Sequence, residues 1–392
     1  MAPLDGITVV SFEHAIAAPF ASRQLAELGA RVIKIERPGV GDFARGYDER
    51  VNGLASHFVW TNRSKQSLSL NLKHPKASDI LDRLFAETDV VLQNLAPGAA
   101  ARLGISFEEL HPKFNQIIVC DISGYGSGGS YLDRKAYDLM IQAEAGFLSV
   151  TGTQDDPAKA GISIADIAAG MYAYSGILAA LIQRSKTGEG SHIDISMLEA
   201  MAEWMSYPMY YAFDGAEAPA RSGADHATIF PYGLFETGDN ERIFLAIQNE
   251  REWEGFCAEV LGQPELAKDV RFARNSLRKD NKEQLKSIIK AAFANLSQEM
   301  LVERLDKAAI ANASMNDMRG LWDHPQLKAR NRWTQVSSPA GLLPALLPPG
   351  RPENAEAAIS AIPDVGEHSG DILTELGYSQ SEIELLSSEG TI

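Results

Sequence analysis

Short apolar runs rich in β-branched residues alternate with longer helical patterns over the first two hundred residues. Such runs are typical of strands buried on both faces of a sheet. The predicted strands are residues 7–11, 31–35, 90–93, 116–122 and 192–195. The predicted helices between them are residues 19–28, 75–86, 107–113, 137–146 and 167–183. This alternation predicts an α/β fold with a doubly wound, Rossmann-like parallel sheet.

The pattern changes after Ala224. Runs at 233–236 and 243–247, separated by Gly238, Asp239 and Asn240, predict a β-hairpin. Three helical patterns follow and complete a smaller α+β domain; they are residues 250–261, 282–294 and 298–309. Residues 197–213 are rich in Met, Trp and Tyr and predict one long helix.

These patterns predict two domains, with the large one built from both ends of the chain. Residues 1–200 form the N-terminal part of the large α/β domain, 201–225 a linker helix, 226–325 the small α+β domain, and 326–392 a linker and a C-terminal return to the large domain. The Pro-rich stretch 338–352 predicts a long extended connection, and 369–376 predicts a helix.

The formal charge of −16 over 392 residues argues against a nucleic-acid partner. An anionic ligand must therefore be held by local basic residues. Cys120 and Cys257 form no disulfide framework and no metal-ligand spacing, so we expect a cytoplasmic protein without a metal. The first residues lack the layout of a signal peptide. No apolar run approaches the length of a membrane span, so no membrane association is expected.

A dinucleotide-binding site is excluded by the turn after the first strand. Glu36 ends the second strand, where an acid that binds ribose would stand. Residues 12–19, however, contain no glycine, and without glycine the backbone cannot approach a pyrophosphate closely.

Asp166 lies in a run of small and apolar residues, 160–171, with no partner nearby in sequence. An acid placed in this way is either a helix cap or a functional carboxylate, such as a nucleophile for acyl chemistry. Basic residues follow several strands, as several phosphates on one ligand would require; they are Lys34, Arg37, Lys73, Arg102 and Lys135.

Several collinear stretches resemble the family III CoA-transferases, the CaiB/BaiF type. They are residues 28–42, 62–73, 93–98, 123–126, the segment around Asp166, 184–190 and 366–369. They span nearly the whole chain, and the small domain matches least.

The resemblance implies that Asp166 is the catalytic aspartate, and it implies a set of residues that contact CoA: Ala17, Arg37, Leu70, Lys73, Asn94, Leu95, Arg102, Lys135 and Tyr137. It implies no permanently bound cofactor, because the coenzyme A thioester is a substrate. It also implies an interlocked homodimer.

The chain departs from formyl-CoA transferase, a member of this family, at two points. Ile16 replaces a glutamine of the first loop, and the tetraglycine loop has no counterpart between Gly223 and Gly233. The related α-methylacyl-CoA racemases carry a His-Asp pair where this chain has Tyr137 and Asp138. Proton exchange at Cα needs a second acid or base, so CoA transfer is favoured over racemisation.

The resemblance implies a reaction in which Asp166 forms a mixed anhydride and then an aspartyl-CoA thioester. The expected substrates are succinyl-CoA as donor and a small dicarboxylic acid, with itaconate or mesaconate as the first expectation. An intramolecular mesaconyl-CoA C1–C4 transferase, a racemase and a non-catalytic CoA-binding protein stay as alternatives. Candidates for binding the acceptor acid are His14, Arg45, Arg50, His226, Gln248 and Asn249.

Overall fold

The computed structural model describes residues 2–350, 352, 354–355 and 358–392. The chain divides into two compact units. The first comprises Met1–Ala145, Ala160–Ser206 and Leu327–Ile392, and the second comprises Gly146–Lys159 and Tyr207–Gln326. The second unit thus includes residues 146–159, which the sequence pattern assigned to the large domain.

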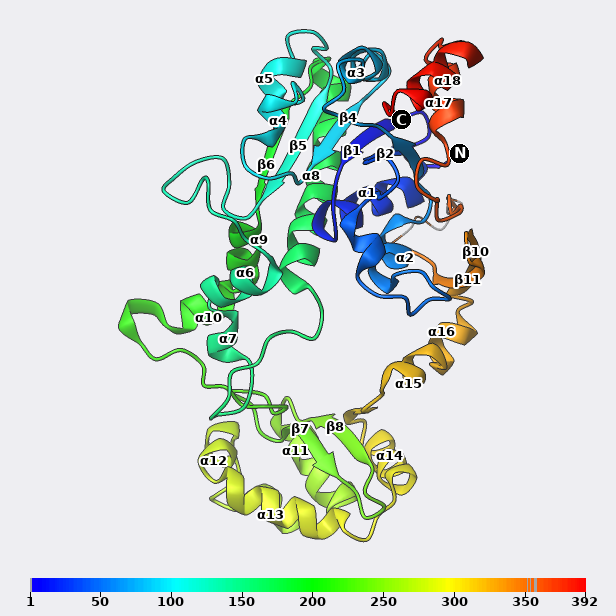
Figure 1. Ribbon diagram of the computed structural model, residues 1–392. Helices are drawn as coiled ribbons and strands as arrows, with labels where there is room; N and C mark the ends of the chain where they lie inside the picture. The colour runs from blue at the N-terminus through cyan, green and yellow to red at the C-terminus, as the bar shows by residue number, and fades with distance from the viewer. Residues whose placement is uncertain (1, 351, 353, 356–357) are drawn as a thin grey trace. The chain divides into compact units, whose positions relative to one another are not determined.

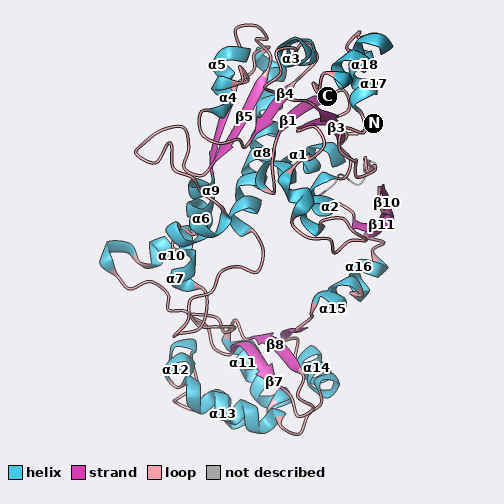
Figure 2. Ribbon diagram, in the orientation of Figure 1, coloured by secondary structure: helices cyan, strands magenta, loops and turns pink. Residues whose placement is uncertain are grey.

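A six-stranded parallel sheet organises the first unit (Figure 2). Its strand order is β3-β2-β1-β4-β5-β6. The strands are β1 (Thr8–Phe12), β2 (Arg31–Glu36), β3 (Gln66–Ser69), β4 (Val90–Gln93), β5 (Ile118–Ser123) and β6 (His192–Ser196). This order is that of a doubly wound sheet, whose direction of winding changes between β1 and β4. The predicted fold class is confirmed, and β3 is a strand that the sequence pattern did not predict.

Helices cover both faces of this sheet. The unit contains α1 (Ala17–Glu27), η1 (Phe43–Gly46), α2 (Ser56–Asn62), α3 (Ala77–Phe85), α4 (Ala99–Arg102), α5 (Phe107–Leu110), α6 (Asp138–Glu144), α8 (Ile164–Thr187), α9 (Met197–Trp204), α17 (Ser369–Glu375) and α18 (Gln380–Ser388). Val10, Ile33 and Val91 pack against α3, α17 and α18, so the C-terminal return is part of this core (Figure 1). The alternate strand residues face the other side, where α1 and α8 lie.

Helix α8 is long and apolar enough, by length and composition alone, to cross a membrane. The expectation that no segment has this character is therefore wrong. The reason is that glycine, serine and tyrosine interrupt the apolar run without lowering its mean hydropathy much. In this fold α8 packs against α1, α6 and α9 and against strands β5 and β6.

The C-terminal connection contains a hairpin of β10 (Trp333–Ser338) and β11 (Gly341–Leu346). The predicted extended connection 338–352 therefore includes a paired strand, β11, that the sequence pattern did not identify. Pro344 argues against a strand because proline has no N–H to donate. It is tolerated here because both strands of a two-stranded ribbon are edge strands.

The second unit is built on a three-stranded antiparallel sheet of β7 (Tyr232–Glu236), β8 (Arg242–Ala246) and β9 (Ala311–Ser314). Trp253, Phe256 and Phe293 lie in its core. The other elements of this unit are α7 (Phe147–Val150), α10 (Ser206–Tyr211), η2 (Phe213–Gly215), α11 (Glu250–Gly255), η3 (Phe256–Val260), η4 (Pro264–Lys268), α12 (Asn275–Asp280), α13 (Lys282–Phe293), α14 (Gln298–Lys307) and α15 (Met318–Trp322), and α16 (Pro325–Ala329) crosses the boundary to the first unit.

The predicted long helix at 197–213 is wrong, because α9 ends at Trp204 and α10 begins at Ser206. Pro208 explains the break: it has no N–H to donate to the carbonyl of Trp204.

Candidate active site

The candidate site lies at the carboxyl edge of the parallel sheet, where the winding changes between β1 and β4. In such sheets ligands bind in the crevice at this point. Two reciprocal hydrogen bonds join the loops that follow these strands. The His14 N–H donates to Asn94 Oδ1, and Asn94 Nδ2 donates to the His14 carbonyl, both at 2.9 Å. The amide of Asn94, a predicted CoA contact, is therefore held in one orientation.

Helices α1 and α8 both begin at this edge and lie side by side (Figure 1). They approach closely at Gly170, where an added Cβ would stand 2.7 Å from the carbonyl oxygen of Ala17. Asp166 stands one helical turn before Gly170, about 6 Å further along the axis. The carboxylate of Asp166 therefore lies beyond the start of α1, beside the loop that follows β1.

Asp166 is not the cap of its helix. Helix α8 begins at Ile164, and Asp166 lies in its first turn. The cap comes from Asp138 at the start of α6, whose Oδ1 accepts hydrogen bonds from the N–H groups of Ala165 at 2.8 Å and Asp166 at 3.3 Å. Gln142 Nε2 holds the other oxygen of Asp138 at 2.6 Å. The helix-cap alternative is thus excluded, and the side chain of Asp166 is left for another role.

The Asp166 carboxylate is poorly stabilised as an anion. Burial, together with the negative charge of Asp138, raises the pKa of Asp166 to about 7. A helix N-terminus normally favours a carboxylate, but here Asp138 already occupies the first free N–H groups. No described residue donates a hydrogen bond to the Asp166 carboxylate. Such a poorly solvated anion is a better nucleophile than a hydrated one.

Below this edge lies a buried cluster of charges. Lys34 Nζ contacts Asp42 at 2.7 Å and Glu13 at 3.3 Å, and Lys65 Nζ contacts Glu13 at 2.6 Å. All four side chains are fully buried. Burial alone would raise the pKa of Asp42 and Glu13, but the lysines lower both pKa values below their ordinary range. Lys34 is therefore a structural residue, and it does not belong to the predicted phosphate-binding cluster.

Asp42 connects this cluster to the site. Its carboxylate accepts hydrogen bonds from the N–H groups of Ala15, at 3.1 Å, and Ala44, at 2.9 Å. Ala15 has a φ of 60°, in the left-handed region that residues with a Cβ rarely adopt. The hydrogen bond to Asp42 thus stabilises the left-handed conformation of Ala15 in the loop after β1. A glycine would adopt this conformation more easily, but the loop contains none.

Arg45 is engaged inside the protein. Its guanidinium binds both carboxylate oxygens of Glu36, at 2.9 and 2.7 Å, and the carbonyl of Pro363 at 3.2 Å. It also lies 3.7 Å above the ring of Phe58. This geometry favours the structural alternative for Arg45 over binding of a substrate carboxylate. Glu36 is equally occupied, which agrees with the exclusion of a ribose-binding acid.

A chain of aromatic rings crosses the site and was missed by the sequence reasoning. His14 stacks on Phe43 with centroids 5.1 Å apart, Phe43 meets Tyr47 at 5.8 Å, and Tyr47 meets His57 at 5.6 Å. Burial and the negative charges of Asp42 and Asp166 raise the pKa of Tyr47, so Tyr47 lies within electrostatic reach of Asp166. The signal in the sequence for these rings was a pair of aromatic residues four positions apart, Phe43 and Tyr47, in a stretch of charged residues.

The predicted CoA contacts all lie at the carboxyl edge, in the segments that follow β1 to β5. Ala17 and Leu70 are buried, so they offer backbone or a limited apolar surface. The cationic side chains of Arg37, Lys73, Arg102 and Lys135 lie outside the core. Asn94 and Leu95 follow β4, and Tyr137 is 69% exposed directly before α6.

The acceptor candidates divide between the units. His14 and the exposed Arg50 belong to the first unit, together with Arg45. In the second unit, the side chain of Asn249 caps α11 and bonds Glu252, and the ring of His226 stacks on Tyr232 at 4.9 Å. Gln248 is exposed, and its backbone N–H bonds Glu252.

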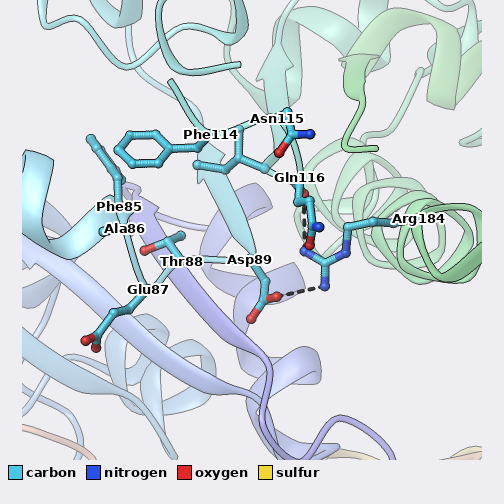
Figure 3. Close-up of a pocket in the computed structure, with 10 residues that line it drawn as sticks. Phe85, Ala86, Glu87, Thr88, Asp89, Phe114, Asn115, Gln116 and Arg184 are labelled. Carbon is cyan, nitrogen blue, oxygen red and sulfur yellow. Dashed lines mark hydrogen bonds and ion pairs between the residues drawn. The ribbon is translucent and has the colours of Figure 1, made fainter. Parts of the chain in front are cut away.

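A separate pocket of about 370 Å³ opens at the opposite edge of the sheet (Figure 3). It lies before β4 and β5, and Arg184 from the last turn of α8 borders it. Arg184 binds Asp89 at 2.7 Å and the carbonyl of Gln116 at 3.2 Å, so its charge is already paired. This pocket does not contain the reactive carboxylate. Among the described residues no cluster of side chains suits a metal ion.

The fold and the site together define an α/β enzyme with a carboxylate at the switch point of its sheet. The sequence model of CoA-transferase family III matches residues 4–369, and the chain belongs to this family. It is a CoA-transferase that uses coenzyme A thioesters as substrates and needs no permanent cofactor.

Relatives with known names agree with this assignment. The chain is 32% identical to the succinate–glutarate CoA-transferase of Agrobacterium fabrum, with 95% of this chain and 96% of that protein covered. It is 31% identical to the mouse succinyl-CoA:glutarate CoA-transferase, with 100% and 91% covered. Other relatives include a succinyl-CoA–D-citramalate CoA-transferase from Chloroflexus aurantiacus and a formyl-CoA:oxalate CoA-transferase from Escherichia coli.

Solved structures support the same family. A CaiB/BaiF family protein from Brucella suis is 33% identical, with a TM-score of 0.85 over 96% of this chain and 99% of that chain.

Proposed function

We propose that this enzyme transfers CoA from succinyl-CoA to a five-carbon dicarboxylic acid, with Asp166 as the nucleophile. The observation that carries the nucleophile is the position of Asp166, partly buried at the switch point, with a pKa raised to about 7 and no hydrogen bond to its side chain from any residue that the structure describes. The relatives support the substrate class, since one of those named above is a succinyl-CoA:glutarate CoA-transferase and another is a succinate–glutarate CoA-transferase.

The first half-reaction begins when an Asp166 oxygen attacks the thioester carbonyl of the donor. The C–S bond breaks, CoA leaves as a thiolate, and an aspartyl mixed anhydride remains. The thiolate then attacks the carbonyl of Asp166 in this anhydride. The donor acid leaves as a carboxylate, and an aspartyl-CoA thioester forms.

In the second half-reaction the acceptor carboxylate attacks the aspartyl thioester and releases the thiolate. The thiolate then attacks the acceptor's carbonyl in the new anhydride, which yields the product thioester and frees Asp166. The overall reaction exchanges one thioester for another of similar energy, and it passes through anhydrides of higher energy that water would hydrolyse. The protein therefore contributes mainly position and exclusion of water.

Asp138 supports this chemistry as a positioning residue. It fixes the first turn of α8 through two backbone N–H groups, and its charge disfavours the free carboxylate of Asp166. Acylation removes the negative charge of Asp166 and therefore relieves this repulsion. The ground state is destabilised relative to the covalent intermediates.

We propose that the phosphates of CoA are bound by Arg37, Lys73, Arg102 and Lys135, the cations outside the core at the carboxyl edge. Asn94 is orientated by its two bonds to the His14 backbone, and with Leu95 it borders the same crevice. A local cluster of cations is required because the overall charge of −16 repels a polyanion.

Within the five-carbon dicarboxylic acids, the relatives favour glutarate over itaconate and mesaconate as the acceptor. All three place two carboxylates on a short carbon chain. Arg50 and His14 are the first-unit candidates for the distal carboxylate, since Arg45 is occupied by Glu36. D-Citramalate and oxalate are the next candidates for the acceptor acid, because two other relatives are named for these acids.

The racemase alternative is disfavoured by the neighbours of Asp166. Tyr137 occupies the position of the second acid or base, and both oxygens of Asp138 hold backbone or side-chain N–H groups. A tyrosine at this position replaces the imidazole that exchanges protons in the racemases.

We propose a homodimer in the cytoplasm. Large apolar side chains are exposed on the single chain, as an interface between copies requires. They include Met171 and Ile182 on α8, and Tyr207, Met209 and Tyr210 on α10. Light scattering of the purified protein tests the dimer, and a monomer at micromolar concentration would contradict it.

The substrate proposal is tested with purified enzyme, succinyl-CoA and a panel of glutarate, itaconate, mesaconate, D-citramalate and oxalate. New thioesters are detected by mass spectrometry, with Asp166→Asn as the inactive control. We expect the highest kcat/KM with glutarate. Deuterium uptake at Cα of a branched acyl-CoA, without any thioester exchange, would establish the racemase instead. Conversion of mesaconyl-C1-CoA without an added acid would establish the intramolecular transferase.

A further inference from the structure

The loop between β3 and α3 is held from outside by the last residues of the described chain. The Asn71 N–H donates to the carbonyl of Thr391 at 2.7 Å, and Asn71 Nδ2 reaches the carbonyl of Gly390 at 3.4 Å. Thr391 is completely buried, although it lies next to the final residue. Lys73, a predicted phosphate ligand, belongs to this loop.

The hydroxyl of Thr391 makes a directed contact. Thr391 Oγ1 lies 3.0 Å from His74 Nδ1. The same ring nitrogen accepts a hydrogen bond from the Lys76 N–H at 3.3 Å, so it is an acceptor and the hydroxyl is the donor. Lys76 in turn pairs with Glu389 at 2.6 Å. Three successive residues of the C-terminal segment, 389–391, thus contact the loop.

The contacts of the C-terminal segment also affect Lys73, through Asn71. Asn71 Oδ1 accepts a hydrogen bond from the Lys73 N–H at 3.2 Å, so the backbone at Lys73 depends on the orientation of Asn71. Asn71 is itself orientated by Thr391 and Gly390. Strand β3 is the edge of the sheet, so no further strand supports the loop on its outer side. The C-terminal segment takes the place of that support.

We propose that residues 389–391 position the β3–α3 loop for binding the CoA thioester, with Thr391 as the central positioning residue. This inference rests on the proposed role of Lys73 as a phosphate ligand. Fixing the loop before binding lowers the ordering cost of the complex, so the effect falls on KM. The chemical step at Asp166 does not involve this loop, so kcat is unaffected.

The test compares Thr391→Val with Thr391→Ser in steady-state kinetics with succinyl-CoA. Valine keeps the volume and removes the hydroxyl, and we expect KM to rise about three- to ten-fold, the range of one net hydrogen bond. Serine restores the hydroxyl and keeps KM within about two-fold of the wild type. Thr88→Val is the matched control, because Thr88 Oγ1 also donates one bond, to the carbonyl of Leu84 at 2.8 Å, at the opposite edge of the sheet.

A second variant separates a loss of loop positioning from a folding defect. Lys76→Met breaks the solvent-exposed pair with Glu389 and leaves the buried Thr391 intact. We expect a smaller rise in KM, with the melting temperature of the wild type. An unchanged KM in both Thr391→Val and Lys76→Met, in proteins that melt like the wild type, would overturn the inference.

A double-mutant cycle with Lys73→Ala separates the inference from the proposed function. We expect Lys73→Ala to raise KM by itself and Thr391→Val to add almost nothing in that background. If Lys73→Ala raises KM and Thr391→Val raises it equally in both backgrounds, the positioning role is wrong while the CoA site stands. If Lys73→Ala leaves KM unchanged, the assignment of Lys73 to the CoA site is wrong, and the positioning role falls with it.

Discussion

The carboxylate of Asp138 binds the backbone N–H of Asp166 at 3.3 Å and at the same time raises the pKa of the Asp166 side chain. One residue therefore fixes the first turn of α8 and makes its carboxylate less stable as a free anion. Two acids that belong to different helices act on each other through backbone geometry and through charge. Burial of Asp166 is the larger cause of its raised pKa, and the charge of Asp138 adds to it, so the pH dependence of the enzyme follows from both.

Activity should rise with pH through the titration of Asp166. The nucleophile must be ionised, and its pKa is raised to about 7, so kcat/KM should fall as the pH drops below about 7. Asp138→Asn removes the neighbouring charge and should move the midpoint of this profile to lower pH, by up to about one pH unit. Asp133→Asn, a change at an exposed acid before α6, is the control and should leave the midpoint in place. A midpoint that is the same in all three proteins would contradict the coupling.

Asp166 should also lower the stability of the fold at neutral pH. Its pKa is raised from an ordinary 3.8 to about 7, so the folded protein holds a proton that the unfolded chain releases between these values. Stability therefore falls as the pH rises from about 4 to about 7. Asp166→Asn should abolish this contribution and stabilise the protein by about 1–3 kcal/mol at pH 8, with almost no gain at pH 4. Urea unfolding at the two pH values measures it, and an equal effect at both would contradict the raised pKa.

The contact between α1 and α8 should tolerate no side chain at Gly170. An added Cβ there would stand 2.7 Å from a backbone oxygen, so Gly170→Ala should cost about 1–3 kcal/mol and reduce activity, since Asp166 is one turn away. Gly176→Ala is the matched control on the same helix. Its Cβ would meet only the Ile193 side chain at 3.4 Å, so this change should be neutral or stabilising by up to about 1 kcal/mol. Thermal melts and kcat of the two variants check the difference, and equal effects would exclude the close approach.

The buried charges should be far more sensitive than surface pairs. Lys34→Met leaves two buried carboxylates without their shared cation and should cost about 3–5 kcal/mol. Lys113→Met breaks an exposed pair with Asp82 and should cost less than about 1 kcal/mol. Chemical denaturation of both variants gives the comparison. A Lys34 variant as stable as the Lys113 variant would show that the buried cluster does not hold the β1–α1 loop.

The sheet and the position of Asp166 were predictable from sequence because strong local patterns mark them. The predicted strand 90–93 matches β4, and the other predicted strands of this sheet differ from the observed ones by one or two residues at one or both ends. Strand β3 was missed because Gln66–Ser69 lacks the continuous apolar run of a buried strand, and its partners are β2 and the distant C-terminal segment.

The local environment of the site could not be predicted, because its contacts cross long distances in sequence. The bond from Ala165 to Asp138 spans 27 residues, and the bond from Arg45 to Pro363 spans 318. A helix cap supplied by another helix gives no local signal. The sequence therefore marked Asp166 as unusual, but its cap, the buried charges and the aromatic chain required the fold.

The central claim is that Asp166 carries CoA covalently during turnover. Incubation of the enzyme with succinyl-CoA alone, followed by borohydride or hydroxylamine, tests it most directly. Mass spectrometry of proteolytic fragments should show the reduced or hydroxamate form at Asp166 and at no other acid, and the Asp166→Asn protein should show none. Full transfer activity without any modification at Asp166, or modification at another carboxylate, would contradict the account.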